Sequence, residues 1–136
     1  MTAQVVIVHN IDHARVAAAA AVELSVPVTL RSAPGAAGYL GPQVFQSMIE
    51  QAAAEYPNAE VQSILDCGDD PGLALAALRH GIACFAVTAD SETLARISDI
   101  AAQSEAILDN SRGPALDLAE SDDASAAVRK WLAADD

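Results

Sequence analysis

The chain has 136 residues, of which 52% are hydrophobic and 19% charged, a composition typical of a folded globular protein. Its formal net charge of -12, from 7 Lys+Arg against 19 Asp+Glu, repels nucleic-acid phosphates and anionic lipid, so we expect neither as a partner. The N-terminal apolar run is too short for a signal peptide, and no later segment approaches the roughly 20 apolar residues of a membrane span. We therefore expect a cytoplasmic protein without membrane contact.

A chain of this length is long enough to bury a core without metal or disulfide bonds, and we expect residues 1–136 to form one domain. Its two cysteines, Cys67 and Cys84, are predicted at opposite ends of neighbouring strands. That offset, roughly 10 Å or more, is too long for a disulfide, so both are expected to be reduced.

Short apolar runs predict strands over residues 5–8, 26–30, 61–65, 82–87 and 106–108. Helical patterns lie between them over residues 12–24, 42–55 and 73–79, with a further helix after Asp90 and a last one after Ser121. Asn10 or Asp12 is predicted to cap the first helix, and Pro42 suits the first position of the second.

Five alternations of strand and helix with short connections predict a single-domain α/β fold, a three-layer αβα sandwich around a five-stranded parallel sheet. This architecture is Rossmann-like or flavodoxin-like, and we prefer the strand order 2-1-3-4-5 to 3-2-1-4-5. A five-unit fragment of a (β/α) barrel has the same local signals and would need a partner subunit to cover its edges.

Ligands of such sheets bind beyond the carboxyl ends of the strands, where the strand order reverses. The first strand flanks the reversal in both predicted orders, which favours His9 and Asn10. The full set of polar residues predicted at strand ends is His9, Asn10, Arg31, Ser32, Asp66, Cys67, Thr88, Asp90, Asp109 and Asn110.

The connection from Arg31 to Gly41 carries glycine at every third position, namely Gly35, Gly38 and Gly41. Backbone amides of such a loop, together with the Arg31 guanidinium and the Ser32 hydroxyl, can hold an anion. The loop has neither the Gly-Lys-Ser/Thr ending of a P-loop nor a Gly-x-Gly-x-x-Gly fingerprint, so a structural turn or a subunit-contact arm is the alternative. A second long connection, residues 110–120, also contains an arginine, Arg112.

Asp66 and Asp69 are candidate ligands for Mg²⁺, because carboxylates are hard oxygen donors. Asp66, Cys67 and His9 are the candidate catalytic residues, with Cys67 as a nucleophile of depressed pKa and His9 as its base. A cysteine at this position is otherwise a small buried apolar side chain. The only lysine, Lys130, lies on the last predicted helix, which excludes the Schiff-base chemistry of pyridoxal phosphate.

The leading hypothesis is a small soluble protein that binds a phosphorylated or carboxylate metabolite through His9, Asn10, Arg31, Ser32, the three loop glycines and Asp66. One alternative is a non-catalytic homo-oligomeric assembly module, built on alanine-rich helices and long edge loops. Another is a hydrolase or lyase that uses Asp66 with a divalent cation.

Overall fold

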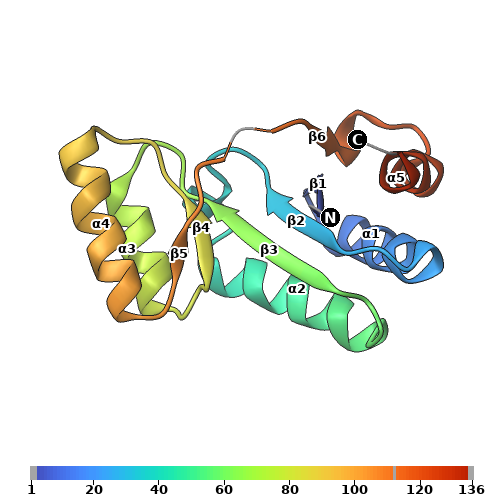
Figure 1. Cartoon of the computed structure of the whole chain (residues 1–136), viewed down its shortest axis with the longest axis horizontal. Helices are drawn as coiled ribbons and strands as arrows, with labels where there is room; N and C mark the ends of the chain where they lie inside the picture. Colours follow the sequence, from blue (N-terminus) through green and yellow to red (C-terminus); the bar gives the residue numbers. More distant parts are fainter. Residues whose placement is uncertain (1–2, 112, 135–136) are drawn as a thin grey trace. The chain divides into compact units, whose positions relative to one another are not determined.

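The computed structural model describes residues 3–111 and 113–134, which contain six strands and five α-helices (Figure 1). The strands are β1 (Gln4–Val8), β2 (Val28–Ser32), β3 (Val61–Asp66), β4 (Cys84–Ala86), β5 (Ile107–Leu108) and β6 (Ala115–Asp117). The helices are α1 (Ile11–Leu24), α2 (Pro42–Glu55), α3 (Pro71–Arg79), α4 (Ser91–Gln103) and α5 (Ala124–Ala133), with short 3-10 turns η1 (Ala36–Gly38) and η2 (Leu118–Glu120).

The strands form one sheet of order β5-β4-β3-β2-β1-β6, and its registered pairs are parallel. The predicted α/β class with a parallel sheet is therefore confirmed. The strand count and both predicted orders are wrong, because β6 pairs with β1 and strands β1 to β5 neighbour one another in chain order. In a fragment of a (β/α) barrel, consecutive strands also lie next to one another. The order of β1 to β5 therefore fits that alternative.

Strand β6 was not predicted, because its three residues lie inside the segment that was predicted to be a loop. The register places Val5 opposite Ala115 and Ile7 opposite Asp117. The order was wrong for a different reason. Apolar runs identify strands, but they do not determine on which side each crossover places the next strand.

The helix starts follow the capping chemistry of the sequence. Asn10 accepts a hydrogen bond from the backbone N–H of His13 and caps α1, as predicted. Asp70 and Asp90 cap α3 and α4 in the same way. The last helix begins later than expected, because Asp123 rather than Ser121 is its cap.

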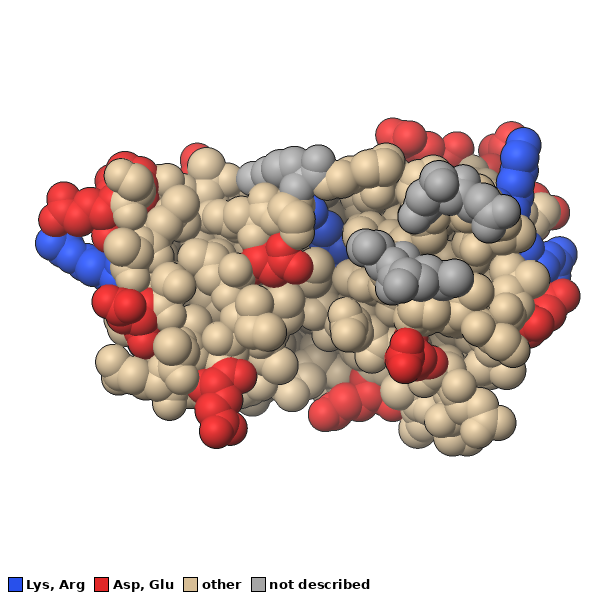
Figure 2. All heavy atoms as spheres, in the orientation of Figure 1, with Lys and Arg blue, Asp and Glu red and all other residues tan. Residues whose placement is uncertain are grey.

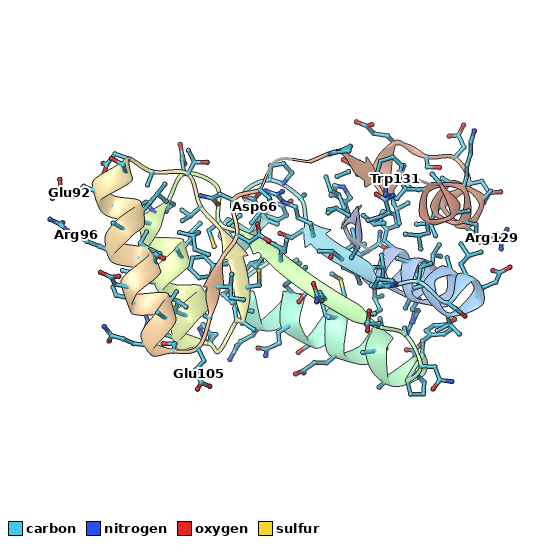
Figure 3. All side chains as sticks on the ribbon, viewed as in Figure 1. Asp66, Glu92, Arg96, Glu105, Arg129 and Trp131 are labelled. Atoms are coloured by element: carbon cyan, nitrogen blue, oxygen red, sulfur yellow. The ribbon has the colours of Figure 1, made fainter. Side chains whose placement is uncertain are left out.

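Contacts divide the chain into two compact units, which are described separately. Unit 1 comprises residues 3–31, 47–63 and 113–134 of the described chain. Here α5 packs on α1, whose small buried residues (Ala14, Ala17, Ala18 and Ala21) permit close approach. Trp131 of α5 donates a hydrogen bond from Nε1 to the carbonyl of Val5, 3.1 Å away, which holds α5 against β1 (Figure 3). Trp131 itself is half-buried and is not among the buried core residues.

Unit 2 comprises residues 32–46 and 64–111 of the described chain. Its core contains Phe45 and Phe85, both almost completely buried, and α3 packs on α4. The unit contains the glycine loop and the carboxyl end of β3. The surface of the chain carries its acidic charge in scattered positions rather than one patch on the drawn face (Figure 2).

Candidate functional site

Asp66 binds the glycine loop to the end of β3 in unit 2. Its Oδ1 accepts hydrogen bonds from the backbone N–H groups of Gly35, at 2.9 Å, and Gly68, at 2.8 Å. Its own N–H donates to the Ser32 hydroxyl, 2.8 Å away. Asp66 is 6% exposed, so these bonds hold a nearly buried carboxylate (Figure 3). The Gly35 amide, expected to face an external anion, instead binds the protein's own anion.

Glycine is required where these two turns meet. Gly35 and Gly68 both have positive φ, 70° and 61°, which strains any residue with a side chain. A Cβ on Gly68 would also lie 3.3 Å from the Cα of Gly35. The backbone of the loop therefore approaches the β3–α3 turn closely, with the Asp66 carboxylate bonded to both.

The other two loop glycines serve the local backbone. The N–H of Gly38 donates to the carbonyl of Gly35 at 3.0 Å and closes η1. Gly41 has a φ of 84°, and its carbonyl accepts from the N–H of Phe45 in the first turn of α2. These contacts favour the structural-turn interpretation of the glycine spacing for Gly38 and Gly41.

The structure corrects the expected chemistry of Cys67. Burial, together with the negative charges of Asp66 and Asp70, raises the pKa of this thiol to about 12. A nucleophilic thiolate needs the opposite shift. Cys67 is fully buried and behaves as an apolar residue, and both cysteines are free, as predicted.

The remaining polar strand ends of unit 2 hold neighbouring turns together. The N–H of Thr88 donates to the carbonyl of Gly68 at 2.7 Å. The Asn110 side chain accepts from the N–H of Val87 at 3.0 Å and donates to its carbonyl at 2.8 Å, which continues the ladder beyond β4. Across residues 3–111 and 113–134, no group of three His, Cys, Asp or Glu residues is placed to hold a metal. Magnesium binding by Asp66 and the exposed Asp69 stays a prediction.

Unit 1 contains a different cluster, at the carboxyl ends of β1 and β6. His9 follows β1, and its Nε2 lies 2.6 Å from Oδ1 of Asp117, the last residue of β6. The same oxygen accepts the N–H of Ala119 at 3.0 Å, which fixes the carboxylate. The side chains of His9 and Asp117 are 31% and 26% exposed, so a ligand can reach them from solvent.

His13, in the first turn of α1, is part of this cluster. Its Nδ1 accepts the backbone N–H of His9 at 3.0 Å, and the two imidazole rings meet edge-on with centroids 5.7 Å apart. Burial lowers the pKa of His13, and the charge of His9 lowers it further, while Asp117 and Asp12 oppose the shift. The cluster therefore favours a neutral His13.

Sequence reasoning missed Asp117 and the role of His13. Asp117 lies 108 residues from His9, and only the β1–β6 pairing brings them together. The signal available was the spacing of His9 and His13, which are four residues apart at a helix start. Arg31 is a half-buried residue of β2, next to β1 in the strand order. Arg112 lies outside the described residues.

A groove of about 140 Å³ lies on the helical side of unit 1. Its lining includes Arg15, Tyr56 and Arg129. The Arg15 guanidinium is already occupied, because its Nε donates to the Glu55 carboxylate at 2.9 Å and its Nη1 lies 3.3 Å from Asp12. This groove thus has little free positive charge to offer an anion through Arg15.

No protein family model and no curated protein sequence matches this chain significantly. Among its described residues, no helix has the length and apolar character needed to cross a membrane.

Replacing Asp66 tests whether its carboxylate holds the loop. Asp66→Ala removes the acceptor of two backbone amides, and we expect the free energy of unfolding to fall by about 3 kcal/mol in urea titrations. Asp66→Asn keeps Oδ1 and should lose less. Asp69→Ala, three residues later in the chain and exposed, is the matched control and should change stability by less than about 0.5 kcal/mol. Equal losses in Asp66→Ala and Asp69→Ala would contradict this role.

The lowered pKa of His13 predicts a pH dependence of stability. As pH falls through about 6.5, the unfolded chain takes up a proton before the folded chain does, so stability present above that pH is lost. Thermal unfolding from about pH 7 to pH 5 should therefore show a steeper loss for the wild type than for His13→Gln. His80→Gln, at an exposed position, should keep the wild-type slope. An unchanged slope in His13→Gln would show that His13 titrates normally.

Proposed function

We propose that this protein binds a small anionic metabolite, phosphorylated or carboxylate, at the carboxyl ends of β1 and β2 in unit 1. The observation that carries the proposal is the position of His9 and Arg31. Each lies at the carboxyl end of its strand, and these parallel strands are neighbours in the sheet order. Parallel neighbours end at the same edge, about 4.8 Å apart, so one small ligand can contact residues from both.

The charge of the chain makes such a local site necessary. With a net charge of -12, the protein attracts an anion only where fixed positive charge outweighs the surrounding field. The Arg31 guanidinium presents a planar fork that matches a carboxylate or phosphate. Asn10 caps α1, a helix of 14 residues whose N-terminus carries a partial positive charge at the same strand end.

In this proposal the glycine loop supports the site rather than forming it. Ser32 follows Arg31 directly, and its hydroxyl accepts the backbone N–H of Asp66. The Gly35 amide binds the Asp66 carboxylate. These bonds restrain the backbone that leaves β2 just after Arg31, and a restrained backbone reduces the entropy lost when a ligand binds.

Isothermal titration calorimetry against a panel of phosphorylated and carboxylate metabolites tests the proposal. We expect heat with at least one of them, and about 30-fold weaker binding in Arg31→Gln, because a charge-assisted hydrogen bond is lost. Arg79→Gln, an exposed arginine at the end of α3, is the matched control and should bind like the wild type. No heat with any member of the panel, or equal affinity in Arg31→Gln, would refute the proposed site.

The second candidate function, homo-oligomeric assembly, is favoured by Ile107. This residue is 63% exposed and lies in β5, the strand at one end of the sheet order. An edge strand exposes unpaired backbone groups that a second copy can pair with.

Sedimentation velocity at micromolar concentration tests this second function. We expect the wild type to sediment as a dimer or larger, and Ile107→Lys to shift toward the monomer because it places a charge on the edge strand. Ile100→Lys changes a less exposed isoleucine on α4 and should leave the oligomer intact. A monomeric wild type would rule out assembly through β5.

A further inference from the structure

The cluster of His9, His13 and Asp117 has the arrangement of an acid–base site. Oδ1 of Asp117 accepts the backbone N–H of Ala119 and also lies within hydrogen-bond distance of Nε2 of His9. The backbone of His9 is held in turn by its bond to the ring of His13. A histidine whose ring is oriented by a carboxylate is a preorganised base, because the carboxylate fixes the tautomer and stabilises the imidazolium that forms.

These hydrogen bonds assign a role to each ring nitrogen. Asp117 accepts from Nε2 of His9, so in the neutral ring Nδ1 carries the lone pair. This Nδ1 has no hydrogen-bond partner among residues 3–111 and 113–134. His13 is the reverse case, because its Nδ1 accepts the backbone N–H of His9 and its proton is therefore on Nε2. One ring offers a base and the other a neutral donor.

We infer that His9 is a general base and His13 a hydrogen-bond donor in proton transfer on a carbonyl-bearing carboxylate with an acidic hydrogen next to the carbonyl. This inference rests on the proposed function, since it names the chemistry and ligand class of the same strand ends. The two rings meet edge-on with centroids 5.7 Å apart, so one small ligand beside them can contact both rings.

The step balances without an oxidant or a co-reactant. Nδ1 of His9 takes the hydrogen as a proton, and the C–H electron pair forms a C=C bond while the carbonyl π electrons move to oxygen. The resulting enolate oxygen accepts a hydrogen bond from Nε2–H of His13, a donor of the oxyanion-hole kind. Return of the proton from His9 to carbon restores the ketone. In D₂O the returning particle is a deuteron, so turnover is visible as isotope exchange.

Pyruvate is the probe, because it is a small carboxylate with a carbonyl and exchangeable methyl hydrogens. ¹H NMR in D₂O should show loss of its methyl signal faster with the wild type than with buffer alone. His9→Gln should lower the protein-dependent rate about a hundredfold, within the range that general-base catalysis contributes. His80→Gln removes a histidine outside the cluster and should exchange at the wild-type rate. Wild type and His9→Gln exchanging equally would overturn the inference.

Asp117 is a positioning residue, and its test needs a signal that a purely structural role would not move. In ¹⁵N NMR of the histidine rings, the wild type should show His9 protonated at Nε2. Asp117→Asn should raise the fraction protonated at Nδ1 and slow the pyruvate exchange. An unchanged tautomer together with an unchanged exchange rate would remove Asp117 from the site.

Saturation-transfer NMR on the same samples separates this inference from the proposed function. Binding of pyruvate without exchange would overturn the acid–base inference and leave the anion site standing. Exchange that persists unchanged in Arg31→Gln would support the acid–base site and refute the anion contact of Arg31. Neither binding nor exchange with saturating pyruvate would count against both.

Discussion

The carboxylate of Asp66 is the constraint on which unit 2 depends. One oxygen accepts two backbone amides, from turns that follow two different strands, and both turns adopt positive φ to reach it. A buried carboxylate with charge-assisted bonds is stable only while its donors stay in place, so the loop, the end of β3 and the start of α3 form one structure. The Ser32 hydroxyl extends the same set of bonds to the end of β2.

Unit 1 depends on a different connection, the pairing of β1 with β6. That pairing places Asp117 beside His9, and α5, which follows β6, packs on α1, which follows β1. The histidine cluster is thus built where two segments far apart in the chain run in parallel. The two strand-end clusters differ in character. Asp66 is almost completely buried and bonded to backbone, while His9 and Asp117 keep about a quarter to a third of their side-chain surface exposed.

Much of the local structure could be predicted because local residues decide it. Asn10 was predicted as a helix cap and Asp90 as the residue before a helix, since a short polar side chain before an apolar helical pattern satisfies a free amide. Asp66 was singled out as a candidate ligand-binding, metal-binding and catalytic residue, and its bonds to two backbone amides were not predicted. One of these amides belongs to Gly35, 31 residues away, which no periodicity reveals.

His9 was chosen because the first strand was expected to flank a reversal of the strand order. The sheet has that reversal, because β2 lies on one side of β1 and β6 on the other. The contact of His9 with Asp117 was not predicted, because β-branched runs and capping residues do not indicate which distant strands pair. Cys67 was given a depressed pKa from its place near a helix start, whereas its burial among apolar residues outweighs that effect.

His9 and Asp117 are 108 residues apart in the sequence, and this distance along the chain affects the order in which the protein folds. Neighbours among β1 to β5 are joined by single helical crossovers, so each can dock soon after it is synthesised. Closing the 108-residue loop between the two cluster residues costs more chain entropy than any of these steps. A nascent chain on the ribosome therefore carries His9 without its carboxylate partner until residues 115–117 have emerged.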